Sequence, residues 1–279
     1  PWWGLTGGRP DRCRRAGGAC VKTEVLYGVH PVVEALRAGR RRFFEIWLAA
    51  GNRSPRADLL RQAAGARGLA VRELPAVQLA ALAGTEAHQG VAARVSAFVG
   101  EELSAAIGPR SGAGPDLILA LDLVQDPHNL GAILRTALCT GVQAVLVPRD
   151  RAAPPTPAVS RISAGALEHT RLVQVPNLVR SLEQAKAHGL WVAGLAADAR
   201  QSLFALDGKL PLVLVVGGEG RGIRPLVRKR CDLLVAIPQA GPLDSLNASV
   251  AAAVALYEVF RQRRYGARPA EEPDVHGRR

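Results

Sequence analysis

The chain has 279 residues, of which 48% are apolar and 22% charged, as in a folded globular protein. This length predicts one large domain or two ordinary ones, and the absence of an uninterrupted apolar stretch of about 18 residues argues against a membrane-spanning helix. The formal net charge of +12 favours a polyanionic partner, with nucleic acid as the first candidate.

Both ends of the chain are expected to be disordered. Residues 1–20 combine Gly, Arg and Pro without the apolar core of a signal peptide, and we extend this segment to residues 1–24. The same expectation holds for residues 266–279. Because the chain contains no methionine, we also expect that Val21 is the natural first residue.

Short helical and strand patterns alternate over residues 25–99, which predicts a compact α/β domain. Its first helix is expected over residues 31–38, because Pro31 suits a first helical turn and Gly39 a position just after the last one. Further helices are predicted at residues 55–67 and 76–83, and strands at residues 43–49, 70–74 and 91–98. Residues 100–115 contain GPRSGAGPD, which breaks both periodicities and predicts a linker.

A second domain is expected over residues 116–265, where continuous apolar runs lie between mostly helical segments. Such runs indicate a parallel sheet covered on both faces. The runs span residues 117–124, 144–147, 172–175, 190–195, 212–216 and 233–237. An amphipathic helix over residues 245–264 is predicted to pack on this sheet or on a partner subunit.

Three polar clusters follow predicted strands, at the sheet edge where ligands bind in open α/β folds. In the first cluster, Asp126 and Asn129 are able to cap the next helix. Arg135 lies in the first turns of that helix, beside apolar neighbours. We expect its guanidinium to bind an anionic or carbonyl partner such as phosphate.

The second cluster, Gly217 to Gly222, places four glycines in six positions. It allows a ligand to approach backbone N–H groups closely, or it forms a tight turn from strand to helix. The third cluster opens the last helix, with Ser245 as the expected N-cap and Asn247 in the first turn. Asn is a poor helix former, and its amide is suited to orient a ligand or a neighbouring side chain.

Together these clusters resemble the signature of the SpoU branch of the SPOUT methyltransferases. The matching segments are DPHNLGAILRTA from Asp126, VGGEGRGI from Val216 and SLNASVA from Ser245. Upstream, LYGVHPVVEAL from Leu26 and HQGVAARV from His88 resemble the substrate-binding domain that some members carry. The resemblance covers residues 26–265 with its motifs in the right order.

The resemblance implies a catalytic domain with a deep trefoil knot, an exception to the rule that chains avoid knots, preceded by an RNA-binding domain of the ribosomal protein L30e type. It further implies a homodimer formed through helices that include the last one, with each active site drawing on both subunits. The resemblance also implies that S-adenosylmethionine lies bent in the knot, held mainly by backbone groups. This cofactor role carries over to Gly217, Ile237 and Leu246. No metal is implied.

The implied reaction is methylation of the ribose 2′-hydroxyl of a guanosine in large-subunit (23S) ribosomal RNA, in the cytoplasm. The catalytic roles carry over to Asn129, Arg135, Glu219, Ser245 and Asn247. A guanidinium with a pKa above about 12 is an awkward general base. We therefore expect Arg135 to anchor the target phosphate and polarise the 2′-oxygen, with the proton acceptor left open. Candidates for RNA contact are Arg40, Arg41 and Arg42, from the basic cluster at residues 37–42.

Two segments depart from the family pattern, and they leave the fit of the substrate open. Residues 149–157 are rich in proline, and residues 239–244 place a proline and an acid before the last helix.

Three other functions remain as alternatives to methylation of 23S ribosomal RNA. They are an enzyme acting on transfer RNA, one conferring antibiotic resistance through another ribosomal site, and a non-catalytic RNA-binding protein. A nicotinamide oxidoreductase is disfavoured, because the glycine-rich segment follows the fifth apolar run instead of the first strand.

The cysteines predict neither a zinc site nor a disulfide framework, because no two of them form a CxxC unit. They are Cys13, Cys20, Cys139 and Cys231.

Overall fold

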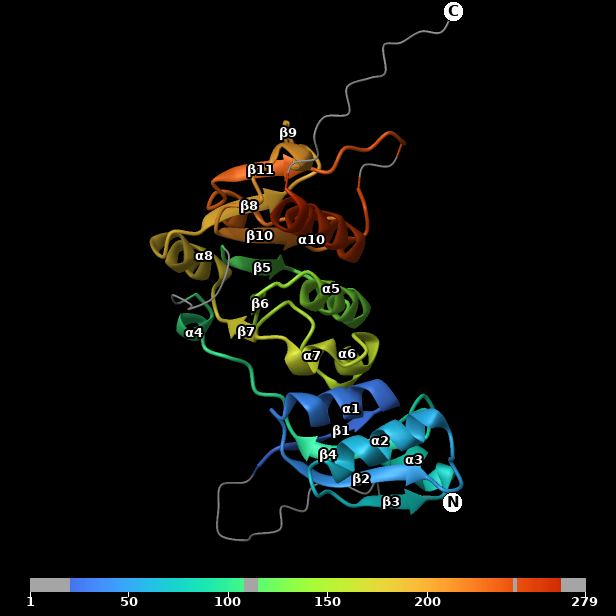
Figure 1. The fold of residues 1–279 in the computed structure, drawn as a ribbon. Helices are drawn as coiled ribbons and strands as arrows, with labels where there is room; N and C mark the ends of the chain where they lie inside the picture. Colours follow the sequence, from blue (N-terminus) through green and yellow to red (C-terminus); the bar gives the residue numbers. More distant parts are fainter. Residues whose placement is uncertain (1–20, 108–114, 243–244, 267–279) are drawn as a thin grey trace, which may run out of the picture.

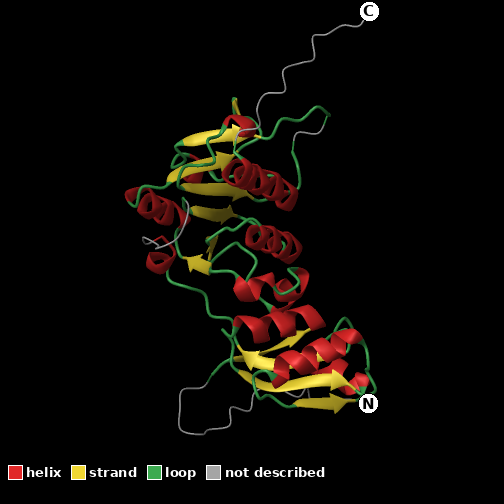
Figure 2. Ribbon diagram, viewed as in Figure 1, coloured by secondary structure: helices red, strands yellow, loops and turns green. Residues whose placement is uncertain are grey.

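The computed structural model describes residues 21–107, 115–242 and 245–266, and Figures 1 and 2 show two α/β units joined end to end. The expectations of disorder for residues 1–20 and 267–279 therefore lie outside the described residues. So does the part of the expected linker at residues 108–114.

The N-terminal unit is a four-stranded sheet with the order β1-β4-β2-β3. Its strands are β1 (Thr23–Tyr27), β2 (Phe43–Ala49), β3 (Val71–Leu74) and β4 (Val91–Ser96). β4 is antiparallel to both β1 and β2, whereas β3 is parallel to β2. β1 was not expected from the sequence, and it begins at Thr23, inside the segment that we expected to be disordered. Its residues alternate between the two faces of the sheet, with Leu26 fully buried.

Helices lie on both faces of this sheet. α1 (Val29–Ala38) and α2 (Pro55–Gly65) share one core with the face that carries Ile46 and Leu48 (Figure 1). The short helix α3 (Ala76–Ala83) packs on the other face, where Leu79 meets Trp47. α3 is too short to cover that whole face. Arg72 and Arg94, on the same face as Trp47, are exposed, so part of this face stays open to solvent.

The C-terminal unit is a seven-stranded sheet with the order β7-β6-β5-β10-β8-β11-β9, in which every pairing is parallel. Its strands are β5 (Leu117–Asp122), β6 (Ala144–Pro148), β7 (Leu172–Val175), β8 (Trp191–Leu195), β9 (Gln201–Ser202), β10 (Leu212–Gly217) and β11 (Leu233–Ala236). All six predicted apolar runs are strands, which confirms the parallel sheet. The two-residue strand β9 was not predicted, because it has no apolar run of its own. The trefoil knot implied by the resemblance stays a prediction.

Two layers of helices cover this sheet, as Figure 2 shows. One core lies under α5 (Pro127–Cys139), α6 (Pro157–Ile162), α7 (Ala166–His169) and α10 (Ala248–Tyr265). The opposite core lies under α4 (Leu103–Ile107), α8 (Leu178–Ala187) and α9 (Pro225–Arg228). Burial on both faces explains why the strands of this sheet are almost uniformly apolar. A 3₁₀ turn, η1 (Leu203–Ala205), follows β9.

The expected linker is ordered in its first half. Glu101 donates its backbone N–H to the Leu172 carbonyl, and its carboxylate pairs with Arg171 at 2.6 Å. Ala106 and Ile107 of α4 are buried in the core of the C-terminal unit. The sequence did not reveal α4, because five residues are too few to show a helical period.

The two units pack directly on each other through α1 on one side and α6 and α7 on the other (Figure 1). Gly165 enters α7 with φ +86, and a Cβ there would lie 2.6 Å from the Glu34 Cβ. Only glycine permits this approach of α1. His169 of α7 hydrogen-bonds Glu34 at 2.8 Å, which adds a polar contact to the same interface.

Two of the arginines expected to contact RNA take part in this interface instead. The Arg41 side chain is 2% exposed and forms an ion pair with the equally buried Glu168. Arg40 donates to the Thr170 carbonyl at 2.7 Å and pairs with Glu101. The expected RNA contact is therefore wrong for Arg41, because its guanidinium is buried and bound to two carboxylates, those of Glu24 and Glu168. Arg42 is exposed.

Candidate active site

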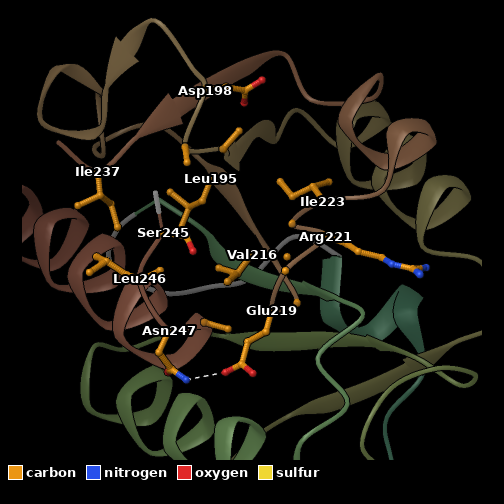
Figure 3. Close-up of a pocket in the computed structure, with 18 of the residues that line it drawn as sticks. Leu195, Asp198, Val216, Glu219, Arg221, Ile223, Ile237, Ser245, Leu246 and Asn247 are labelled. Carbon is orange, nitrogen blue, oxygen red and sulfur yellow. Dashed lines mark hydrogen bonds between the residues drawn. The ribbon is translucent and has the colours of Figure 1, made fainter. Parts of the chain in front are cut away.

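A pocket of about 590 Å³ lies at the carboxyl ends of β8, β10 and β11, beside the start of α10 (Figure 3). Its apolar walls come from Leu195, Val216, Ile223, Ile237 and Leu246. Polar groups reach it from the turn after β10 and from the segment before α10. The position fits the rule that open parallel sheets bind ligands at the carboxyl ends of their strands.

A hydrogen-bonded network of three side chains joins the predicted clusters at the edge of this pocket. The Glu219 Oε1 atom accepts from Asn129 Nδ2 at 2.8 Å and from Asn247 Nδ2 at 2.6 Å. Asn247 Nδ2 also lies 3.1 Å from Asn129 Oδ1. Figure 3 shows Glu219 and Asn247 pointing toward each other. Residues far apart in sequence thus hold one carboxylate in a fixed orientation.

Asn247 also begins the last helix. Its Oδ1 atom accepts from the backbone N–H of Ser249 at 2.9 Å and from that of Val250 at 3.4 Å. The expectation that Ser245 caps this helix is wrong, since α10 starts at Ala248 and Asn247 is the N-cap. An N-cap with this bonding explains why a poor helix former stands here. The capping also fixes the direction in which the Nδ2 donor points.

The glycines after β10 allow close contacts between backbone segments of the chain. A Cβ on Gly217 would lie 2.1 Å from the carbonyl carbon of Gly222, and one on Gly218 would lie 2.2 Å from the Leu123 carbonyl oxygen. Gly220 and Gly222 have positive φ and open space around them. The first two glycines therefore allow the chain to fold closely on itself, and the later two allow the turn. The sequence suggested the turn but not its close contact with the residue after β5.

A buried carboxylate that sequence reasoning missed supports the same turn. Asp122, at the end of β5, is fully buried and accepts from the backbone N–H of Arg224 at 2.8 Å and from its Nε at 2.7 Å. These charge-assisted bonds tie the residues after the glycine turn to the neighbouring strand. The signal in the sequence was an acid ending an otherwise apolar strand.

A second acid, Asp198, lines the pocket together with Glu219. Asp198, after β8, forms a bidentate ion pair with Arg228 of α9, with N···O distances of 2.8 and 2.9 Å. Hydrogen bonds from Arg228 lower the pKa of Asp198. The carboxylate therefore stays charged at neutral pH. Because the pair is exposed to solvent, it adds little to the stability of the fold. Its role is to shape the rim of the pocket.

The structure brings together most of the predicted site. The pocket is lined by Gly217, Glu219, Ile237, Ser245, Leu246 and Asn247. Asn129 is 7% exposed and reaches the pocket through Glu219. Arg135 is exposed on α5 and is not among the lining residues. One chain therefore does not place this arginine in its own pocket.

The sequence matches two known families over the parts that form these units. Residues 116–257 match the SpoU rRNA Methylase family, and residues 25–98 match a family described as RNA 2′-O ribose methyltransferase substrate binding. The chain belongs to the SpoU rRNA methylase family. It is 46% identical over 242 residues to the 23S rRNA (guanosine-2′-O-)-methyltransferase RlmB of Pseudomonas aeruginosa, a match covering 86% of this chain and 97% of that protein.

Solved structures agree with this membership. The crystal structure of an RNA 2′-O ribose methyltransferase matches with 27% identity and a TM-score of 0.72, over 86% of this chain and 89% of that chain. An AdoMet-bound rRNA methyltransferase from Sinorhizobium meliloti matches with 25% identity and a TM-score of 0.72, over 86% of this chain and 88% of that one. As a SpoU methyltransferase, the chain is an RNA 2′-O-methyltransferase that uses S-adenosylmethionine.

The pocket has the chemistry that this methyl donor requires. Its apolar walls suit an adenine ring, and the carboxylates of Asp198 and Glu219 suit hydroxyl groups and a cationic centre. Gly217, Gly218, Gly220 and Gly222 line the same pocket, so no side chain of theirs fills the space beside the backbone. Among the residues that the structure describes, no group of His, Cys, Asp and Glu is placed to hold a metal ion. Nor is any helix of the described part long and apolar enough to cross a membrane.

Proposed function

We propose that this protein is a cytoplasmic homodimer that methylates the ribose 2′-hydroxyl of a guanosine in 23S ribosomal RNA. The observation that carries the proposal is the network of Asn129, Glu219 and Asn247 at a pocket suited to the methyl donor. The relative from Pseudomonas aeruginosa, named for this reaction, supports the choice of substrate. The basic character of the chain supports RNA as the partner.

The exposed position of Arg135 supports a site shared between two subunits. Arg135 lies on α5, which packs on α10, and both helices expose apolar side chains. Leu138 is 41%, Val250 47% and Tyr257 52% exposed. Such residues on packed helices fit an isologous contact with a second copy of the chain. In that dimer, Arg135 of one subunit completes the pocket of the other.

Each residue has a role in this scheme. The donor supplies a methyl group on a cationic sulfur. Arg135 anchors the phosphate next to the target ribose and polarises the 2′-oxygen, because its guanidinium stays charged and presents several donors. Asn129 and Asn247 hold the Glu219 carboxylate in place. Gly217, Ile237 and Leu246 would hold the cofactor, and the exposed Ser245 would complete the lining of the site.

The test is to incubate the protein with labelled S-adenosylmethionine and unmodified 23S rRNA, and to map the product by primer extension. We expect one 2′-O-methylguanosine, and loss of the signal with Arg135→Ala at saturating RNA. Labelling of transfer RNA in its place would support the alternative substrate, and the absence of any labelled ribose would refute the proposal. Sedimentation of the wild-type protein should give the mass of two copies of the chain.

A further inference from the structure

An aromatic ring between two arginines lies on the part of the N-terminal sheet that α3 leaves open. The Arg42 guanidinium carbon is 5.2 Å from the centroid of the Phe44 ring, and that of Arg94 is 5.9 Å from it. Both arginines are exposed and Phe44 is half-buried. Arg42 belongs to the basic cluster at residues 37–42. Among the contacts that the structure describes, it is the arginine of this cluster that neither pairs with an acid nor enters the interface between the units.

The local backbone explains why Phe44 lies here. The pairing of β2 with β4 shifts between Phe43 and Glu45, so that Glu45 lies opposite Arg94. Phe43 then packs into the core under α1 and α2, and the irregularity turns Phe44 toward the arginines. A bulge of this kind re-aims a side chain out of the regular alternation. The aromatic ring is therefore held on the sheet surface by the fold itself.

The charge of this surface is positive. Arg72 on β3 is 70% exposed and lies 3.6 Å from Glu45, which also pairs with Arg94 at 3.0 Å. Two arginines thus share one carboxylate, and Arg42 adds a third positive charge beside the Phe44 ring. The surface attracts a polyanion, and the ring and the guanidinium planes offer faces on which a base can stack.

We propose that Arg42, Phe44 and Arg94 form a base-stacking site for an unpaired segment of the RNA substrate. Aromatic rings and arginine planes on a positively charged sheet are the features with which proteins bind single-stranded RNA. A duplex offers no exposed base face to such a surface, so the site selects a loop or bulge. The inference rests on the proposed function, since it adds a second contact to the same RNA outside the catalytic pocket.

Binding of a single-stranded RNA oligonucleotide carrying 2-aminopurine tests the proposal, with the full chain and without S-adenosylmethionine. Stacking quenches the fluorescence of the modified base. We expect Phe44→Leu to weaken binding about tenfold and to remove the quenching, and Phe44→Trp to retain both. Arg42→Ala together with Arg94→Ala should weaken binding and reduce its salt dependence.

The matched control is Arg53→Ala together with Arg56→Ala, which removes the same charge from exposed positions at and just before the start of α2, the helix on the other face. An equal loss of binding in this control, or unchanged quenching in Phe44→Leu, would overturn the proposal. So would an RNA duplex that competes as well as the single strand. Because the arginines are exposed, their variants report on binding even if Phe44→Leu folds poorly. The assay involves no methyl transfer, so failure to methylate 23S rRNA remains a separate result.

Discussion

Arg41 and Glu168 form a bidentate ion pair across the interface of the two units, with Nε to Oε2 at 2.6 Å and Nη2 to Oε1 at 2.9 Å. Ser160 donates to the same carboxylate at 2.7 Å, and the Arg41 guanidinium lies 5.2 Å from the centre of the Phe98 ring. Burial acts to lower the pKa of Arg41, but the hydrogen bonds and charges of Glu168 and Glu24 together outweigh it and the pKa is raised. The Arg41 guanidinium therefore keeps its charge inside the interface.

Removing one partner of this pair should destabilise the protein strongly. Glu168→Ala removes the fully buried partner of Arg41 and leaves Glu24 as its remaining acidic partner. We therefore expect the free energy of unfolding to fall by about 2 kcal/mol, with a clear drop of Tm in calorimetry. Glu183→Ala, which breaks the exposed pair with Arg230, is the control and should cost less than about 1 kcal/mol. The double variant Arg41→Met with Glu168→Met should lose less than the single one. Equal effects of Glu168→Ala and Glu183→Ala would contradict the buried role.

The close contact behind the glycine turn should make the cofactor pocket sensitive to one methyl group. In Gly218→Ala the new Cβ meets the Leu123 carbonyl oxygen at 2.2 Å, so the turn has to move. We expect a large loss of S-adenosylmethionine affinity in a calorimetric titration. Gly220→Ala is the matched control, because its Cβ meets no described atom within 4 Å and its positive φ costs only on the order of 1 kcal/mol. If both variants bind alike, contact with Leu123 does not shape the pocket.

Mixing two inactive variants should reveal whether Arg135 serves the partner subunit. Arg135→Ala and Glu219→Ala are each expected to lose activity. Refolded together, they should recover about a quarter of wild-type turnover, because half of the dimers are mixed and each has one complete site. The measurement is methyl incorporation into 23S rRNA, after sedimentation has confirmed that the mixture is dimeric. If the mixture stays inactive, Arg135 and Glu219 act within one subunit.

The Cys231 thiol should react slowly, in contrast to the exposed Cys139. Burial, aided by the Asp232 charge, raises the pKa of Cys231 from 9.0 to about 11. Alkylation by iodoacetamide at pH 8, followed by peptide mass spectrometry, should therefore label Cys139 before Cys231. The labelling rate of Cys231 should rise about tenfold per pH unit up to that pKa, because the thiolate is the nucleophile. Similar rates for both thiols at pH 8 would show that burial does not hold the proton.

The raised pKa of Cys231 also sets the sign of a pH effect on stability. The folded state keeps the thiol proton between pH 9.0 and about 11, whereas the unfolded state loses it. The contribution of Cys231 is therefore complete below pH 9 and is lost as the pH rises through that window. In Cys231→Ser this part of the alkaline decline in the free energy of unfolding should disappear.

The sequence by itself determined the sheet of the C-terminal unit, the clusters at its edge and the family. Continuous apolar runs such as that of β10 have one stable placement, between two layers of helices. The motifs around Asn129, Glu219 and Asn247 carry chemistry that is readable from residue types and order alone. A tight turn was one of the two expectations for the glycine segment. These features depend on local pattern, which a sequence displays directly.

Only the tertiary structure decided which polar residues meet. Nothing local distinguishes Arg41, buried against Glu168, from Arg42, which stays exposed beside Phe44, because burial depends on how the two units pack. The same holds for Gly218, whose missing side chain makes room for a residue about a hundred positions earlier in the chain. Contacts between distant segments carry no period and no fixed spacing, so they become visible only when the fold brings the segments together.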